Sequence, residues 1–339
     1  MRDPVMNRFK SLTICSMLFG VACGGKPTAS APTASPAVSS PTAPIVATSA
    51  PVPSASASVA PATAERPRLK PVLQIKEGIS TPESVLYDDI EDRYLVSNIN
   101  GDPIATDNNG FITEISPDGK ITRPKFIAGG VNKVKLDAPK GTGIFKGTLY
   151  VSDITVVRKF DAKTGAPKGD IPIAGATFLN DIAVSADGKI YVSDSGLKHG
   201  ANGLESNGGD AVFVIEANKP HVISRSKDLA GPNGLAVVGQ QLVVVTFGSE
   251  QVYTLSDKGV KSEVTKLPAG GLDGVVALGD ELLISSWQAS SVFRGKLGGK
   301  FEVAIPEVKS PADIGYDTKR KRVLVPHFTE NSVEVFDLP

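Results

Sequence analysis

The feature that most constrains the fold of this chain is a short pattern that recurs six times. Each copy has a polar residue or a glycine in its second position, continues with apolar residues and a turn, and ends in a β-rich run such as residues 94–98 or 191–194. The copies begin at Pro82, Lys140, Leu179, Pro232, Leu272 and Ala312. A strand-built period of about 40 residues is characteristic of propeller blades. The sequence therefore predicts an all-β fold, a six-bladed β-propeller.

The predicted propeller occupies residues 69–339. Residues 331–338 and 69–75 both have the pattern of a strand, so we expect the N-terminal strand to complete the last blade and close the ring. Two polar insertions, residues 98–107 and 197–209, follow what we take to be inner strands. Loops at such places either shape the mouth of the central channel or elaborate the surface, and both interpretations stay open here.

Residues 1–23 have the features of an export signal. A basic start and a short apolar stretch lead to Cys23, and the end of this stretch resembles the lipobox of bacterial lipoproteins, which implies acylation of Cys23. The alternative is an ordinary secretory signal cut near Ala22. Residues 24–68 are nearly all Pro, Ala, Ser, Thr and Val, a composition typical of a disordered linker. We expect a domain that is exported and lipid-anchored to the cell envelope, at the outer membrane or the periplasmic face, or otherwise secreted.

The charge balance limits which partners the chain can have, and the cysteine content limits its disulfides and metal sites. Lys and Arg together number 36, as do Asp and Glu, so the formal net charge is zero. This balance gives no reason to expect nucleic acid as a partner or electrostatic recruitment to a membrane. Both cysteines, Cys15 and Cys23, precede the predicted domain, which excludes a disulfide framework or a thiolate metal site within it. We expect a monomer that acts on a small-molecule substrate.

The second residues of the six copies form the candidate site. They are Glu83, Gly141, Asn180, Asn233, Asp273 and Asp313. Five of the six carry a side-chain oxygen, and carboxylates that meet around a narrow channel are costly unless a cation neutralises them or they are protonated. Oxygen donors without His or Cys suit a hard cation, Ca²⁺ first and Mg²⁺ or Mn²⁺ after it. The alternative for any one residue is that Asn-Gly and Asp-Gly form turns or local caps.

The residues around these positions resemble the gluconolactonase and senescence-marker-protein (regucalcin-like) family of six-bladed propellers. The resemblance covers residues 71–339 and depends on four segments: Thr81-Pro82-Glu83, Leu179-Asn180-Asp181, Gly231-Pro232-Asn233-Gly234-Leu235-Ala236 and Leu272-Asp273-Gly274-Val275. It implies that Glu83, Asn233 and Asp273 bind a divalent cation and that Asn180 contacts water or substrate beside it.

Two residues depart from the family pattern. Phe178 stands where members that act on sugar lactones commonly have Arg, so an apolar ring replaces a guanidinium in the substrate-binding region. Asp313 adds a carboxylate where a small neutral residue is usual, and it could join the metal shell, hold a second cation, contact substrate or bond the sixth strand.

The sequence therefore predicts a divalent-metal-dependent hydrolase of lactones or esters on the cell surface. Asp273 would accept a proton from a metal-bound water or attack directly, with Asn180 and Asn233 orienting the substrate. A non-catalytic, lipid-anchored propeller used as a binding platform is the alternative from another class. A lyase or sensor built on a similar propeller stays open as a third.

Overall fold

The computed structural model describes residues 69–201 and 203–338. The predicted export signal (1–23), the linker (24–68) and the acylation site Cys23 lie outside the described residues. Within the described part of the chain, no helix has the length and apolar character needed to span a bilayer. The only helical element there is the short 3₁₀ helix η1 (Lys227–Leu229).

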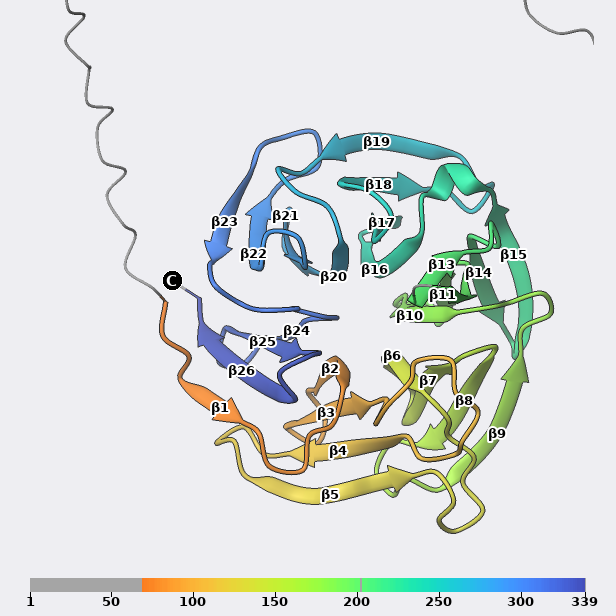
Figure 1. Ribbon diagram of the computed structural model, residues 1–339, viewed down its shortest axis with the longest axis vertical. Coiled ribbons are helices and arrows are strands. Elements are labelled where there is room, and N and C mark those ends of the chain that lie inside the picture. The colour runs from red at the N-terminus through yellow and green to blue at the C-terminus, as the bar shows by residue number, and fades with distance from the viewer. Residues whose placement is uncertain (1–68, 202, 339) are drawn as a thin grey trace, which may run out of the picture. The chain divides into compact units, whose positions relative to one another are not determined.

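Six four-stranded antiparallel sheets surround a common centre, as Figure 1 shows. Blade 1 contains β2 (Pro82–Asp88), β3 (Arg93–Asn98), β4 (Phe111–Ile115) and β5 (Ile121–Ala128). Blade 2 contains β6 (Pro139–Phe145), β7 (Thr148–Asp153), β8 (Val156–Asp161) and β9 (Pro167–Pro172). Blade 3 contains β10 (Leu179–Val184), β11 (Ile190–Asp194), β14 (Ala211–Glu216) and β15 (Lys219–Arg225). Blade 4 contains β16 (Pro232–Val238), β17 (Gln241–Thr246), β18 (Gln251–Leu255) and β19 (Lys261–Lys266). Blade 5 contains β20 (Leu272–Leu278), β21 (Glu281–Ser286), β22 (Ser291–Gly295) and β23 (Phe301–Ile305). Blade 6 contains β24 (Gly315–Asp317), β25 (Arg322–His327), β26 (Ser332–Asp337) and β1 (Leu73–Ile75).

The N-terminal strand closes the ring, which confirms the prediction. β1 pairs with β26 in antiparallel register, with Leu73 opposite Val335 and Ile75 opposite Val333. The outer edge of blade 6 is therefore made by the first strand of the propeller, while its other three strands come from the end of the chain. Joining the two ends in one sheet makes every blade depend on both of its neighbours.

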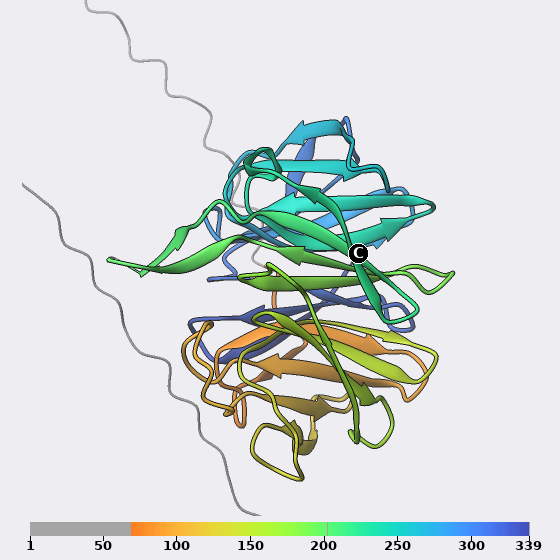
Figure 2. The same ribbon diagram turned by 90° about the vertical axis from the view of Figure 1, so that its right-hand side faces the viewer.

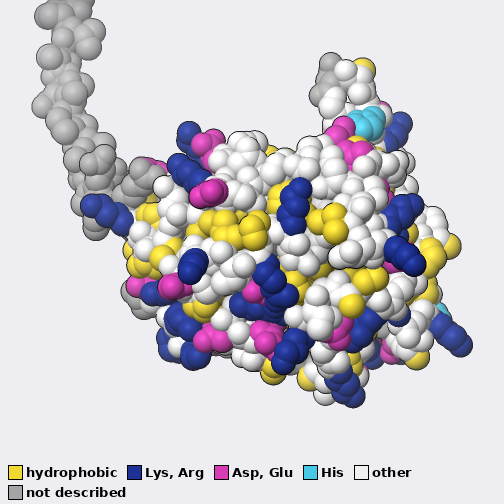
Figure 3. Space-filling view, turned by 90° about the horizontal axis from the view of Figure 1, so that it is seen from below, with side chains coloured by type: hydrophobic (Ala, Val, Ile, Leu, Met, Phe, Trp, Pro, Cys, Tyr) yellow, Lys and Arg dark blue, Asp and Glu magenta, His cyan; other side chains and the backbone are white. Residues whose placement is uncertain are grey.

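The apolar core lies between neighbouring blades. Leu95 and Ile112 of blade 1 cluster with Leu149 and Val151 of blade 2, and the other blade pairs have equivalent clusters. Both faces of each sheet are covered in this way, which explains why the second strands of the blades are buried along nearly their full length. Figure 3 shows charges of both signs interspersed over one side of the ring.

Inner strands of blades 1 to 5 share a β-bulge that begins at the first residue. The ladder shifts between Pro82 and Ser84 in β2, and in β16 between Pro232 and Leu235, with equivalent shifts in β6, β10 and β20. A bulge leaves residues out of the regular pairing and redirects their side chains. It acts here on the second residue of each inner strand, so that side chain is free to point along the channel instead of into a blade.

This register corrects two positions of the expected ring. Pro139 pairs with Asp153 as Pro232 pairs with Thr246, so the second residue of the inner strand in blade 2 is Lys140, not Gly141. Pro311 bridges His327 in the same way, which places Ala312 instead of Asp313 at this position in blade 6. We call Glu83, Lys140, Asn180, Asn233, Asp273 and Ala312 the head positions. The error arose because the repeats were aligned on ligand-type side chains, whereas cross-strand pairing defines the equivalent residues.

The two insertions also follow different strands from those expected. They follow β3 and β11, which are the second strands of their blades and not the inner ones. The second insertion forms an extra hairpin, β12 (Leu197–Gly200) and β13 (Gly203–Ser206), which projects from the ring in Figure 2. His199 Nε2 of this hairpin lies 3.3 Å from Asp102 Oδ2 of the first insertion. The two insertions therefore meet each other.

Candidate functional site

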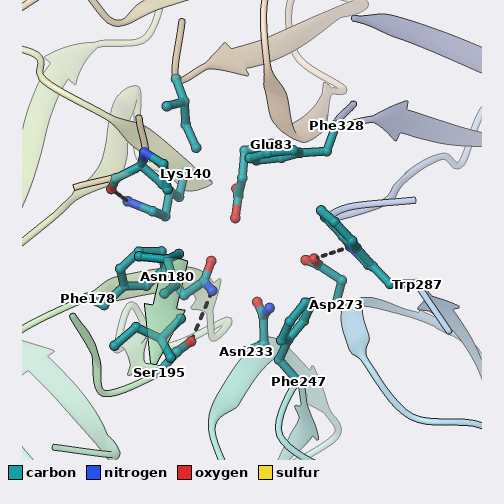
Figure 4. Close-up of a pocket in the computed structure, with 14 residues that line it drawn as sticks. Glu83, Lys140, Phe178, Asn180, Ser195, Asn233, Phe247, Asp273, Trp287 and Phe328 are labelled. Atoms are coloured by element: carbon teal, nitrogen blue, oxygen red, sulfur yellow. Dashed lines mark hydrogen bonds between the residues drawn. The ribbon is translucent and has the colours of Figure 1, made fainter. Parts of the chain in front are cut away.

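Four head side chains from four different blades converge on one cavity. Glu83 on β2, Asn180 on β10, Asn233 on β16 and Asp273 on β20 line it together, and Figure 4 shows their polar ends pointing toward a shared centre. Each of these residues is at most 5% exposed. The structure thus brings together the four residues for which the sequence predicted metal-binding or catalytic roles.

A repeated serine holds the heads in place. In blade 3, Ser193 Oγ accepts a bond from the backbone N–H of Asp181, next to the head of its own blade (2.9 Å), and donates to the carbonyl of Asn233, the head of the next blade (2.6 Å). In blade 5, Ser285 does the same between Gly274 (2.8 Å) and Ala312 (2.8 Å). This serine is the one in the repeated β-rich run, and it fixes the bulge and spaces adjacent inner strands.

One oxygen in each of these four side chains has no hydrogen-bond partner among the described residues. These atoms are Glu83 Oε2, Asn180 Oδ1, Asn233 Oδ1 and Asp273 Oδ1. Other atoms of two of these groups are held: Asn180 Nδ2 donates to Ser195 Oγ (3.0 Å), and Trp287 Nε1 donates to Asp273 Oδ2 (2.8 Å). Unpaired buried oxygens are costly, so four of them facing one cavity indicate a site suited to a positively charged ligand.

The donor set fits a hard divalent cation. Two carboxylates and two amide oxygens are the ligand types that Ca²⁺ takes. Among the described residues no group of three or more His, Cys, Asp or Glu side chains is placed to hold a metal. That result is consistent with the geometry, because half of the donors here are amides. Glu83, Asn180, Asn233 and Asp273 are therefore the residues that would hold the ion.

Burial and neighbouring charges shift the pKa values of the two carboxyl groups that line the cavity. Burial, followed by the charges of Asp273 and Asp313, raises the pKa of Glu83 well above its ordinary value. Burial and then the charge of Asp313 raise the pKa of Asp273, and only the bond from Trp287 opposes them. A bound divalent ion would favour the charged form of both groups.

Lys140 is a residue of the site that sequence reasoning missed. Its ammonium donates to the carbonyls of Pro103 (3.0 Å) and Ala138 (3.1 Å) and lies 4.3 Å from the ring centre of Phe178. Burial lowers the pKa of Lys140 to about 8, although the charge of Glu83 opposes this shift. A signal was present in the sequence, because a proline precedes Lys140 as one precedes Glu83 and Asn233.

A second layer of residues lies one position after the heads, and we call it the lower layer. Its members are Ser84, Gly141, Asp181, Gly234, Gly274 and Asp313. Asp313 accepts a bond from Ser84 Oγ (2.6 Å) and does not line the cavity, so its position gives no support to the predicted contact with substrate. Burial, followed by the charge of Asp313, raises the pKa of Asp181, and burial raises that of Asp313 to about 7.

The glycines of the lower layer are required by close packing. A Cβ at Gly234 would lie 2.3 Å from the carbonyl oxygen of Asp273, and one at Gly274 would lie 2.3 Å from the backbone nitrogen of Ile314. Neither glycine has a positive φ. The Asn-Gly and Asp-Gly pairs are therefore not turns here. They place a ligand-type side chain at the head and leave room for the next inner strand behind it.

Apolar side chains form the wall above the four oxygens. Its members are Ile99, Pro103, Phe178, Leu197, Leu204, Phe247, Trp287 and Phe328. Four of them, Ile99, Pro103, Leu197 and Leu204, come from the two insertions, which confirms that these segments shape the mouth. Phe178, predicted to face the substrate, lies in this wall. The cavity volume is about 220 Å³.

Comparisons with known proteins agree on the fold. No protein-family model matches the chain, and no curated protein matches it. Among solved structures, it is similar to a gluconolactonase from Xanthomonas campestris (TM-score 0.59, 17% identity, 78% of this chain and 88% of that one). It is also similar to a putative gluconolactonase (0.57, 17%, 80% and 96%) and to virginiamycin B lyase from Staphylococcus aureus (0.53, 13%, 78% and 98%). At these identities the likeness shows the fold alone, and it confirms the resemblance to the six-bladed gluconolactonase propellers.

Proposed function

We propose that this protein is a divalent-metal-dependent hydrolase of lactones or esters, with Ca²⁺ as the ion. The observation that carries the proposal is the convergence of four unpartnered buried oxygens, from Glu83, Asn180, Asn233 and Asp273, at the floor of one cavity. The fold shared with a gluconolactonase supports it.

The residues that line the cavity would have separate roles in hydrolysis. A bound divalent ion would polarise a carbonyl oxygen and acidify a water. Asp273 would accept the proton of the attacking water through Oδ1, or attack the carbonyl itself, and the bond from Trp287 to its other oxygen supports this role. Asn180 presents its oxygen to the cavity, since its N–H group is bonded to Ser195. The apolar wall limits access of bulk water.

Metal binding and turnover can be measured separately on the full chain. We expect Ca²⁺ to bind with a stoichiometry of one, to be removed by a chelator, and to support hydrolysis of a panel of lactones and aryl esters. Glu83→Gln should weaken Ca²⁺ binding and hydrolysis together, because it removes one of the two carboxylate donors. Glu302→Gln is the matched control, since Glu302 is exposed, and it should change neither.

The results discriminate between the candidate functions. Ca²⁺ binding without turnover of any lactone or ester would favour the binding platform over the hydrolase. A protein that neither binds Ca²⁺ nor turns over substrate would contradict the proposal entirely.

Location at the cell surface belongs to the same proposal. Acylation of Cys23 would anchor the domain to the envelope through residues 24–68. We expect a fatty-acid label to enter the wild-type protein and not Cys23→Ser, and the variant to leave the membrane fraction. Equal labelling of both proteins would argue against a lipid anchor at this residue.

A further inference from the structure

We propose that the site takes a small, uncharged acyl substrate with a flat apolar body, such as an aryl ester or an aryl-substituted lactone, and discriminates against polyhydroxylated sugar lactones. This inference depends on the proposed function for its reaction, but the substrate class follows from the wall of the cavity.

Part of the lining of the cavity is a second ring built by the repeat. The residue after the second strand of a blade is Ile99 in blade 1, Ser195 in blade 3, Phe247 in blade 4, Trp287 in blade 5 and Phe328 in blade 6. Each donates its backbone N–H to the segment that leads into the inner strand of its own blade, for example Phe247 to Gly231 (2.9 Å) and Trp287 to Gly271 (2.9 Å). All five line the cavity. In five of the six blades the repeat thus presents a side chain to the cavity at this position, and in blades 4, 5 and 6 that side chain is an aromatic ring.

Three of these rings form one continuous aromatic surface. Trp287 meets Phe247 at a centroid distance of 5.5 Å and Phe328 at 5.3 Å. Figure 4 shows the three rings on one side of the converging oxygens, with Phe178 and Lys140 on the other. A flat apolar group would bury its surface against these rings while its carbonyl reached the floor.

Sugar hydroxyls would find few free partners in this wall. Ser195 Oγ already accepts from Asn180 and donates to the carbonyl of Pro232 (2.8 Å). The N–H of Trp287 is bonded to Asp273, and Lys140 already donates to two carbonyls. Hydroxyl groups buried without partners are costly, so each added hydroxyl would weaken binding.

Charge and size narrow the class further. Four carboxyl groups, Glu83, Asp181, Asp273 and Asp313, lie in the buried part of the channel against the single ammonium of Lys140. The carboxylates of Glu83 and Asp273 would balance a divalent cation, and Lys140, the basic residue that lines this cavity, already donates to two carbonyls, so little positive charge is left for an anionic substrate. The cavity volume of about 220 Å³ lies below the roughly 300–1,000 Å³ of drug-sized pockets, so the ligand must be small.

Binding can be tested without turnover, because Trp287 is the only tryptophan of the chain and lies in the wall. The full chain in Ca²⁺ buffer is titrated with acetanilide, a non-ester aryl probe, and with sorbitol and benzoate, and Trp287 fluorescence is recorded. We expect saturable quenching by acetanilide, none by sorbitol at tenfold higher concentration, and weaker binding of benzoate. The inference would be overturned if sorbitol or benzoate bound as tightly as acetanilide. It would also be overturned if acetanilide did not bind.

A kinetic arm separates this inference from the proposed function. Phenyl acetate should be hydrolysed with a higher kcat/KM than glucono-lactone, and Phe328→Ala should raise KM for phenyl acetate about tenfold while Ca²⁺ affinity stays unchanged. Leu204→Ser changes a second residue of the wall and should also raise KM for phenyl acetate. Because Leu204 is 41% exposed, this substitution puts folding at little risk. Val303→Ala, at 40% exposure away from the cavity, is the control. Acetanilide binding without hydrolysis of either substrate would refute the hydrolase and leave the ligand class standing. A glucono-lactone preference would refute the ligand class.

Discussion

The head positions and the lower layer are one residue apart in the chain, yet they satisfy their oxygens in opposite ways. At the heads, Glu83 and Asp273 each leave one buried oxygen without a partner among the described residues. In the lower layer, both oxygens of Asp181 accept backbone N–H groups, from Leu235 (2.7 Å) and Ile182 (2.6 Å), and Asp313 accepts from Ser84. The carboxyl groups of both layers are buried, but only those at the head positions line the cavity and are open to a ligand.

The difference separates a binding role from a structural one. Burial raises the pKa of carboxyl groups in both layers, so a shifted pKa alone would not distinguish them. Hydrogen bonding does: the lower layer is completed by the protein, whereas the head layer needs a partner from outside. Acidic side chains of the lower layer tie neighbouring inner strands together, and those of the head layer face the cavity.

Substitutions at the head positions and in the lower layer should differ most in their effect on turnover. Asp273→Asn removes the predicted proton acceptor, so kcat for an aryl ester should fall by about 10²–10⁴-fold. Asp313→Asn keeps the shape of the lower layer and should lower kcat by less than about tenfold. Stopped-time assays at saturating Ca²⁺ measure both. If the two variants lost activity equally, the division between the layers would be wrong.

The next largest effect should be on folding, and it belongs to the lower layer. Gly274→Ala would place a Cβ 2.3 Å from the backbone nitrogen of Ile314 and 2.6 Å from the Cα of Asp313. Backbone atoms cannot move aside as a flexible side chain can, so we expect a loss of about 3 kcal/mol in the free energy of unfolding. Gly299→Ala is the control, since its nearest atom lies at 3.2 Å, and it should cost less than about 1 kcal/mol. Denaturant titrations compare them, and equal losses would show that the inner strands can separate.

Calcium should act on the head layer alone. An ion that binds the folded state at a hundred times its Kd stabilises it by about 2.7 kcal/mol. We expect a chelator to lower Tm accordingly in the wild type and in Asp313→Asn, and to have little effect in Glu83→Gln. A full Ca²⁺ response in Glu83→Gln would place the ion elsewhere.

The pH dependence of stability should show both layers. A carboxyl group whose pKa is raised in the folded state keeps its proton while the unfolded chain ionises, so the folded state binds more protons and stability falls as pH rises. For Asp313 this loss runs from near pH 4, the ordinary range, to about pH 7. Without Ca²⁺, Glu83 and Asp273 add to the decline. With Ca²⁺ bound, only the loss of stability that comes from Asp181 and Asp313 should persist. Plots of Tm against pH with and without the ion should therefore diverge as pH rises. Parallel curves would contradict this.

Much of this architecture could be predicted because each copy of the repeat has similar residue types at equivalent positions. The blade count, the closing strand and the meeting of Glu83, Asn180, Asn233 and Asp273 all follow from residues that recur at equivalent places. Lys140 and Ala312 were missed because alignment by side-chain chemistry favoured Gly141 and Asp313, one residue later. Prolines at 139 and 311, matching Pro82 and Pro232, carried the correct register.

The apolar wall was harder to foresee from the sequence. Phe247, Trp287 and Phe328 follow the β-rich runs directly, but a single aromatic residue after a strand has many possible environments. Only the closed ring, with the inner strands packed around one axis, brings these three together. The hairpin of β12 and β13 carries Leu197 and Leu204 to the cavity and contacts the other insertion through His199 and Asp102, and neither arrangement has a signal in the sequence.

The smallest predicted effect concerns the serine that joins the layers. Ser285 Oγ accepts from Gly274 N–H and donates to the carbonyl of Ala312, both at 2.8 Å. Ser285→Ala leaves both backbone groups unpaired in a buried place and should cost about 1–3 kcal/mol, toward the lower end because a methyl group replaces the hydroxyl with little change of volume. Asp273 lies next to Gly274, so the loosened bulge should also weaken Ca²⁺ binding slightly, by less than about tenfold. Ser262→Ala, at an exposed position of β19, is the control for stability. Should Ser285→Ala unfold like the wild type and bind Ca²⁺ unchanged, the bulge would hold the heads without this link, and close packing of the lower layer would be sufficient to place them.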